Sequence, residues 1–190
     1  MDIIVNLSVN RREHASAFDV NCAGTYHCLL AAVASGHRRF VNTAPHFSVI
    51  GSGYEDADFR ITEEAPPHPG VNLYAISKGL GVELCRVFSR NHPLEVLCAL
   101  FYNLPAGGSP APGAPPDVTP FSVTFPDAAQ AILRCVEVGS ERLPAGGAFH
   151  AFFILAPLPH NKFASRKARE VLGWRAEDSL REYFTRGPRL

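Results

Sequence analysis

The sequence lacks an excess of charge of either sign. Its 190 residues include 18 Lys and Arg and 18 Asp and Glu, so the formal net charge at pH 7 is zero. Without an overall field, nothing draws the chain toward nucleic acid or an anionic membrane surface. We therefore expect a small-molecule ligand that is recognised by local groups, and neither a nucleic-acid nor a membrane partner.

Long hydrophobic runs and patterned cysteines are also missing. No segment approaches the roughly 20 apolar residues of a membrane-spanning helix, and the first apolar run is too short for a signal peptide. The five cysteines form no C-x-x-C pair, and the eight histidines show no zinc-ligand spacing. We therefore expect reduced cysteines, no metal site and a cytoplasmic location.

The sequence does contain enough apolar material for one packed core, since 46% of its residues are hydrophobic and 10% aromatic. Strand-like and helix-like segments alternate along it. We expect strands at 2–9, 39–43, 94–100 and 148–155, and helices at 16–35, 74–91, 127–138, 162–172 and 177–184. Such alternation predicts an α/β fold with a parallel sheet and right-handed crossovers.

The helical periodicity also predicts which side chains face the core. In the helix at 16–35 the inner stripe consists of Phe18, Cys22, Leu29, Leu30 and Val33. In the helix at 74–91 it consists of Ile76, Leu80, Leu84, Val87 and Phe88. The stretch 105–120 is rich in proline and glycine and has no periodicity, which indicates an irregular connection.

A tyrosine and a lysine stand four residues apart at the start of the helix at 74–91. On a helix, Tyr74 and Lys78 share one face. A phenol titrates near pH 10, and a neighbouring positive charge favours the phenolate by roughly one to three pKa units. Lys78 can supply that charge and make Tyr74 a base. The same spacing also fits a packed ring beneath a solvated amine.

The order of the surrounding segments decides between these readings. The chain resembles the extended short-chain dehydrogenase/reductases, the NAD-dependent epimerase/dehydratase family. The resemblance rests on Val20-Asn21-Cys22-Ala23-Gly24-Thr25, Phe40-Val41-Asn42-Thr43, Thr62-Glu63-Glu64, Tyr74-x-x-x-Lys78, Phe101-Tyr102-Asn103 and Leu172-Gly173-Trp174. It implies an incomplete Rossmann-type parallel sheet with flanking helices and a small C-terminal substrate lobe. Residues 1–104 would be the C-terminal half of a dinucleotide-binding domain, and residues 105–190 a substrate-binding lobe with one returning strand at about 148–155.

The resemblance also implies roles for individual residues. Tyr74 would exchange a proton with a substrate hydroxyl or keto group while hydride passes to or from the nicotinamide, and Lys78 would hold the nicotinamide ribose. The substrate would be a sugar nucleotide or a hydroxysteroid-like compound. The resemblance further implies contacts with the cofactor, NAD or NADP, from Leu7, Ser8 and Leu104, and contacts with the substrate from His46 and Asn103.

A third catalytic group is less clearly marked. The family carries a Ser or Thr on the loop after the preceding strand, and here the alignment places His46 at that position. Thr43 is the first candidate for the missing hydroxyl and Ser48 the second. The alternatives are that Thr43 caps the end of its own strand and that His46 is a solvated loop histidine.

The sequence contains no G-x-G-x-x-G motif, the turn that holds a pyrophosphate at a helix N-terminus. The resemblance therefore implies that about two βαβ units, on the order of 60 residues, are missing ahead of the first strand. We expect weak or no dinucleotide binding, and self-association through the bare edge of the strand at 2–9. Two functions stay open: an NAD(P)-dependent epimerase, dehydratase or dehydrogenase, and a catalytically silent binding module.

Overall fold

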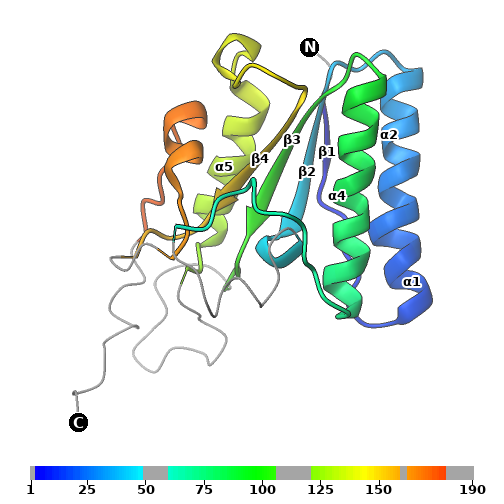
Figure 1. The fold of residues 1–190 in the computed structure, drawn as a ribbon, viewed down its shortest axis with the longest axis horizontal. Helices are drawn as coiled ribbons and strands as arrows, with labels where there is room; N and C mark the ends of the chain where they lie inside the picture. Colours follow the sequence, from blue (N-terminus) through cyan, green and yellow to red (C-terminus); the bar gives the residue numbers. More distant parts are fainter. Residues whose placement is uncertain (1–2, 49–59, 106–120, 159–161, 179–190) are drawn as a thin grey trace.

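A parallel β-sheet forms the centre of the molecule (Figure 1). The computed structural model describes residues 3–48, 60–105, 121–158 and 162–178. In this part the strands lie in the order β1-β2-β3-β4, and each pair of neighbours is parallel. Their bounds are Ile3–Asn6 for β1, Arg39–Pro45 for β2, Glu95–Phe101 for β3 and Phe149–Ile154 for β4. The expected α/β class and parallel sheet are confirmed.

Helices cover both faces of this sheet (Figure 1). One face carries α4 and a continuous helix that consists of α1, a π-helical segment and α2, while α5 lies on the opposite face. The bounds are His14–Phe18 for α1, Asp19–Gly24 for the π-helical segment, Thr25–Ala34 for α2, Leu73–Asn91 for α4 and Phe125–Glu137 for α5. No helix in the described ranges is long and apolar enough to cross a membrane.

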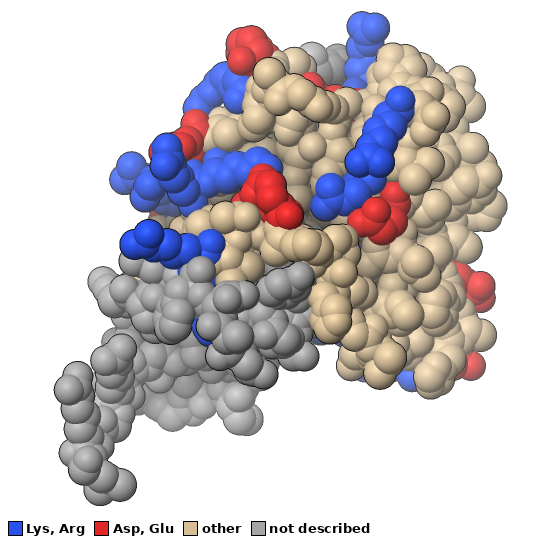
Figure 2. All heavy atoms as spheres, viewed as in Figure 1, with Lys and Arg blue, Asp and Glu red and all other residues tan. Residues whose placement is uncertain are grey.

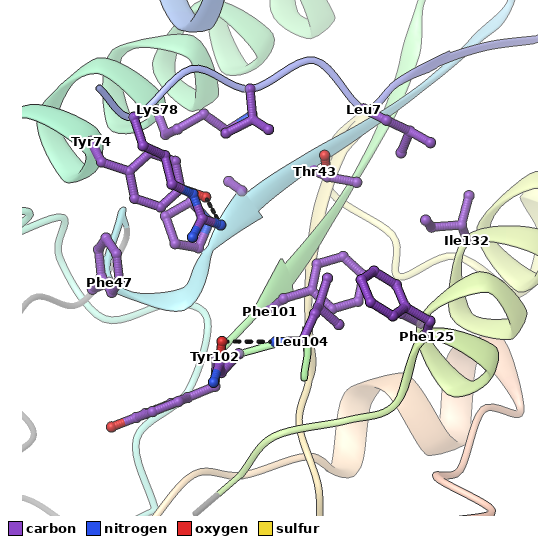
Figure 3. A pocket seen from close by; sticks show the side chains of 16 residues that line it. Leu7, Thr43, Phe47, Tyr74, Lys78, Phe101, Tyr102, Leu104, Phe125 and Ile132 are labelled. Carbon is purple, nitrogen blue, oxygen red and sulfur yellow. Dashed lines mark hydrogen bonds between the residues drawn. The ribbon is translucent and has the colours of Figure 1, made fainter. Parts of the chain in front are cut away.

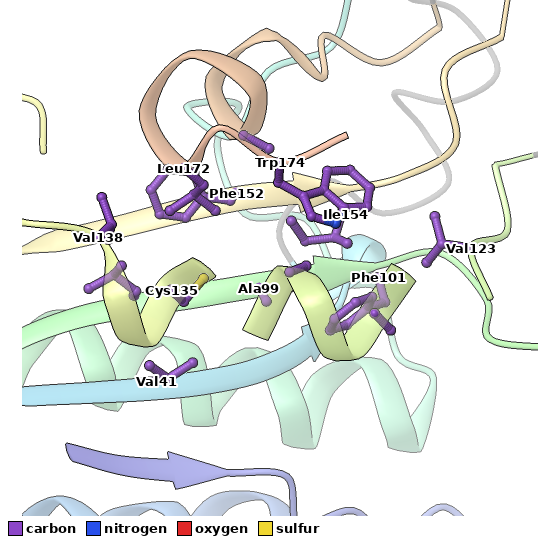
Figure 4. Close-up of a cluster of buried hydrophobic side chains, with 14 residues drawn as sticks. Val41, Ala99, Phe101, Val123, Cys135, Val138, Phe152, Ile154, Leu172 and Trp174 are labelled. Atoms are coloured by element: carbon purple, nitrogen blue, oxygen red, sulfur yellow. The ribbon is translucent and has the colours of Figure 1, made fainter. Parts of the chain in front are cut away.

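The last crossover differs from the uniformly right-handed prediction. The chain steps across the sheet in one direction from β1 to β4, but α5 lies on the face opposite to α2 and α4. The third crossover therefore has the opposite hand to the first two. The physical reason is visible in Figure 4, where α5 and Trp174 bury a second apolar layer that includes Val41, Phe152 and Ile154. Without α5 these fully buried side chains would face water.

The predicted inner stripe of α4 is right at Phe88, which is buried, and at Leu84, which packs against the same core cluster, but it is wrong at two other positions. Leu80 and Val87 are 43% and 51% exposed, whereas Val82 and Cys85 are buried. The reason is a close contact between helices: a Cβ on Gly81 would lie only 2.6 Å from the carbonyl oxygen of Asn21. A small residue must therefore stand where α4 meets the π-helical segment, and Leu80 and Val87 turn outward.

The first helix departs from its predicted stripe for a related reason. Phe18 and Leu30 are 37% and 42% exposed. The fully or almost fully buried positions of this helix include the polar residues Asn21 and Thr25, together with Leu29. Leu29 is buried as predicted. The polar side chains bond to neighbouring elements, as described below, so hydropathy alone does not find their positions on the buried face.

The C-terminal part of the chain joins the same core. The helix expected at 162–172 is present in shorter form at residues 166–172, and it packs against α5 and β4 through Ala168 and Leu172. The expected helix at 177–184 and the stretch 105–120 lie almost wholly outside the described residues. The division into residues 1–104 and 105–190 remains a prediction. On the face seen in Figure 2, basic and acidic side chains are interleaved, and they lie mainly over the half that contains α5.

Candidate active site

A cavity of about 630 Å³ opens at the carboxyl ends of β1, β2 and β3. This is the edge of a parallel sheet at which α/β proteins place their ligands. One wall is α4 and the other is the start of α5 (Figure 3). Of the residues predicted for the site, the cavity brings together Leu7, Thr43, Tyr74, Lys78, Asn103 and Leu104.

Tyr74 is fixed in the first turn of α4. The Asn72 side chain caps this helix, because its Oδ1 accepts hydrogen bonds from the backbone N–H groups of Tyr74 and Ala75 at 3.0 and 3.2 Å. The ring of Phe47 packs edge-to-face on the Tyr74 ring, with centroids 5.7 Å apart. The cap and the aromatic contact together hold the phenol at the cavity wall.

Lys78 is nearly closed off from solvent. The residue is 3% exposed, and its Nζ donates a hydrogen bond to the carbonyl oxygen of Ser8 at 3.2 Å. Burial lowers the pKa of Lys78, and the nearby charge of Arg11 lowers it further. Ser8 itself does not line the cavity, so its link to the site runs through this carbonyl.

The cation next to the phenol is Arg11, which the sequence reasoning missed. Its Nη2 donates to Tyr74 Oη at 3.3 Å, and its Cζ lies 4.4 Å from the centroid of the ring. Burial raises the pKa of Tyr74 above its usual value, and the charge and hydrogen bond of Arg11 only partly oppose that rise. The expectation that Lys78 lowers this pKa is therefore not met. A signal was present, since Arg11 follows the first strand, on a loop of the kind that carries sites.

The loop that carries Arg11 is held by a buried asparagine. Asn21, on the π-helical segment, accepts a hydrogen bond from the backbone N–H of Asn10 at 2.9 Å and donates Nδ2 to the Asn10 carbonyl. The same Nδ2 donates to Ser77 Oγ on α4 at 3.0 Å. Single π turns inside α-helices are frequent at functional sites. Here the π-helical segment ties the Arg11 loop to α4.

A second asparagine shapes the exit of β1. Asn6 is buried, and its Nδ2 donates to Asn42 Oδ1 at 3.0 Å and to Thr25 Oγ1 at 3.2 Å. Its Oδ1 accepts from the backbone N–H of Ser8 at 3.2 Å and from the Ser8 hydroxyl at 2.7 Å. These bonds fix the turn after the strand, and Leu7 lines the cavity from it.

Of the three candidates for the third catalytic group, only Thr43 lines the cavity. Its hydroxyl donates to the Asn6 carbonyl of the neighbouring strand at 3.1 Å. Ser48 is buried and donates to the Pro45 carbonyl at 2.7 Å. His46 is not a solvated loop residue: it is 3% exposed and stacks on Tyr102 with ring centroids 4.1 Å apart. Geometry therefore favours Thr43, and its catalytic role remains a prediction.

The residues after β3 form the floor of the site. Asn103 and Leu104 both line the cavity, and Asn103 Oδ1 accepts a hydrogen bond from the Leu104 backbone N–H at 3.0 Å (Figure 3). Phe125 and Ile132, both on α5, close the side opposite Tyr74. Within the described ranges, no three His, Cys, Asp or Glu side chains gather as a metal site.

Solved structures resemble this chain in fold, whereas neither a protein-family model nor a curated protein matches its sequence. A UDP-glucose 4-epimerase from Thermotoga maritima, with UDP-glucose, has a TM-score of 0.71 at 18% identity over 95% of this chain and 74% of that chain. A UDP-glucuronic acid 4-epimerase from Bacillus cereus, in complex with NAD, has a TM-score of 0.72 at 14% identity over 96% and 71%.

A glucuronic acid dehydrogenase from Chromohalobacter salexigens has a TM-score of 0.74 at 20% identity, and the match covers 96% of this chain and 63% of that chain. All three identities are low, so these likenesses establish the fold. The resemblance drawn from the sequence is confirmed at that level: the chain has the Rossmann-type fold of NAD-dependent epimerases and dehydrogenases.

Proposed function

We propose that this chain carries the acid/base side of an NAD-dependent epimerase or oxidoreductase that acts on a hydroxyl or keto group of a small molecule. The observation that carries the proposal is the position of Tyr74 and Lys78. Both line one cavity at the carboxyl edge of the sheet, and Thr43 lines the same cavity from the end of β2. The structural neighbours support the reaction class, since one is an epimerase with UDP-glucose, one an epimerase in complex with NAD and one a glucuronic acid dehydrogenase.

The chain's own groups would divide the proton chemistry. In its deprotonated form Tyr74 takes the proton of the substrate hydroxyl, and in the reverse direction it returns that proton to the keto oxygen. The Thr43 hydroxyl, whose one proton bonds the Asn6 carbonyl in this structure, would turn to donate it to the same substrate oxygen, and Lys78 would bind the ribose hydroxyls of the cofactor. When bound, NAD supplies the hydride acceptor.

The cavity suits the nicotinamide half of a dinucleotide but not its pyrophosphate and adenosine. Lys78, Leu7 and Leu104 line the cavity and suit a nicotinamide riboside, whose ring needs apolar walls and whose ribose needs donors. The chain itself contributes no G-x-G-x-x-G turn for a pyrophosphate. We expect the adenosine half of NAD or NADP to add little affinity to this chain. Losing several charge-assisted hydrogen bonds moves a micromolar site to about millimolar.

Titration with NADH, NADPH and reduced nicotinamide mononucleotide tests this proposal through nicotinamide fluorescence. All three ligands should bind with dissociation constants of about a millimolar, within a few-fold of one another, and Lys78→Ala should weaken all of them. A micromolar constant for NADH with far weaker binding of the mononucleotide would contradict a site that holds only the nicotinamide half.

The second candidate is a catalytically silent binding module. It is favoured by the missing glycine motif and by the Tyr74 pKa, which burial moves away from the value that a base needs at neutral pH. The same titration separates the two candidates. A silent module gives no nicotinamide signal at several millimolar ligand and no turnover of any hydroxyl or keto compound.

A further inference from the structure

We propose that Arg11 binds a carboxylate of the substrate, so that the cavity accepts a hydroxy or keto acid whose carboxylate lies one or two carbons from the reacting oxygen. The inference rests on the proposed function of Tyr74 and adds a substrate class to it. It depends on three observations: the charge of the cavity wall, the unused donors of Arg11, and the distance between Arg11 and Tyr74.

The cavity wall carries positive charge without a negative counterpart. Among the described residues that line it, Arg11 and Lys78 are cations, and none is Asp or Glu. Most of the remaining wall is apolar, with Leu7, Phe125 and Ile132 as examples. A carboxylate that leaves water for such a cavity needs a charged donor. A ligand without negative charge would leave the cations unmatched.

Arg11 is the cation that is free to meet a ligand. It is exposed, and among the described residues it forms no ion pair. A guanidinium has five N–H donors in a planar fork that matches a carboxylate, and the bond to Tyr74 Oη uses one of its nitrogens. Lys78 differs, because it is 3% exposed, one of its three donors is bonded to Ser8, and the proposed function assigns the others to the cofactor ribose.

The position of Arg11 limits the length of the acid. Its Nη2 lies 3.3 Å from Tyr74 Oη, the atom that would receive the substrate's hydroxyl proton. A carboxylate oxygen on Arg11 and a hydroxyl on Tyr74, each at hydrogen-bond distance on the cavity side, would lie roughly 3–5 Å apart. Hydroxyl and carboxylate oxygens have this spacing in 2-hydroxy and 3-hydroxy acids. A carboxylate at the far end of a long substrate does not fit the arrangement.

Arg12 provides a matched control. It is the next residue on the same loop, it is also exposed, and it is not among the residues that line the cavity. Its backbone N–H donates to Asn10 Oδ1, a bond that a side-chain substitution leaves in place. Arg11→Met and Arg12→Met therefore remove the same charge from the same loop, but only the first removes it from the cavity.

The experiment measures binding without turnover. Lactate and 3-hydroxybutyrate are compared with their neutral amides, lactamide and 3-hydroxybutyramide, by ligand-detected NMR on the wild type and on both variants. At least one acid should bind the wild type and Arg12→Met about tenfold more tightly than its amide, since the charge-assisted pair is lost in the amide. Arg11→Met should bind acid and amide equally, with an unchanged melting temperature.

Two results would overturn the inference: a wild type that does not prefer either acid to its amide, or an Arg11→Met variant that keeps the preference. The proposed function fails separately. Tyr74→Phe should keep the preference for the acid, because Arg11 remains, so acid binding without any turnover supports Arg11 and contradicts the enzyme. Turnover of neutral alcohols without a preference for acids would support the enzyme and contradict the role of Arg11.

Discussion

Replacing Gly81 by alanine tests the close contact between α4 and the π-helical segment. The new Cβ would lie 2.6 Å from the carbonyl oxygen of Asn21, a separation shorter than real Cβ contacts show. Overpacking usually costs about 1–3 kcal/mol, and the upper part of that range, about 2–3 kcal/mol, applies here because a backbone carbonyl cannot rotate away. Alanine also recovers about 1 kcal/mol of helix propensity relative to glycine. The net effect should be a loss of about 1–2 kcal/mol of stability.

Thermal unfolding followed by circular dichroism measures this loss. For a chain of this size, 1 kcal/mol shifts the melting temperature by about 2–4 °C, so Gly81→Ala should lower it by roughly 2–8 °C. The control is Gly79→Ala on the same helix. Its Cβ would meet the Ser48 carbonyl oxygen at 3.3 Å and Pro69 Cγ at 3.5 Å, which small shifts can relieve. Gly79→Ala should melt at or above the wild-type temperature.

The contact also has a functional consequence. Asn21 holds both the N–H and the carbonyl of Asn10, one residue before Arg11. An alanine at position 81 that displaces Asn21 should therefore weaken the preference for acids over amides, and Gly79→Ala should not. A Gly81→Ala variant that melts at or above the wild-type temperature would refute the claim that this contact fixes the helix spacing.

Four other predictions concern the chemistry, the pH dependence and the association state. Tyr74→Phe should abolish turnover while leaving nicotinamide binding nearly intact, and Thr43→Val should lower turnover about a hundredfold; equal turnover in either variant removes that residue from the mechanism. Because burial raises the pKa of Tyr74 above 10, the base form grows with pH, so the rate of oxidation should rise about tenfold per pH unit through neutrality; a plateau near pH 7 would contradict it. Burial raises the pKa of Cys98 to about 11 and that of Cys135 to about 12, whereas the unfolded thiols titrate near 8.5. Below about pH 8.5 these thiols contribute their full stability, and that contribution is lost as the pH rises toward 11 and 12. The urea midpoint of unfolding should therefore fall between pH 8 and pH 10.5. An unchanged midpoint would argue against burial of the two thiols. Val5, 38% exposed on the edge strand β1, should promote self-association that Val5→Lys suppresses in sedimentation velocity, and a monomeric wild type at micromolar concentration would rule this out.

Local signals made much of the fold predictable. Each strand is a short apolar run, because strands buried in a parallel sheet need little else. The bounds of β2, β3 and β4 lie within two residues of their expected positions, and β1 ends three residues early. The start of α4 was also predicted, from the helical spacing of Tyr74 and Lys78, and the structure adds the Asn72 cap just before them. The candidate catalytic pair follows directly from that helix start.

The errors arose where distant parts of the chain meet. The exposure of Leu80 follows from the approach of α4 to Asn21, a contact that periodicity within one helix cannot reveal. His46 is buried because Tyr102 and Phe163, far along the chain, stack around it. Arg11 was overlooked, because its contact with Tyr74 spans 63 positions in sequence.

Because the third crossover has the opposite hand, the shape of the accepted compound and the proton-transfer chemistry depend on different helices. Because α5 crosses the far face of the sheet, Phe125 and Ile132 reach the cavity from a helix that shares no wall with Tyr74 and Lys78. Libraries built at Phe125 and Ile132 can therefore vary the shape of the accepted compound while the proton-transfer groups and their cap stay untouched. For a protein engineer, α5 is the place to change selectivity and α4 is the helix to leave alone.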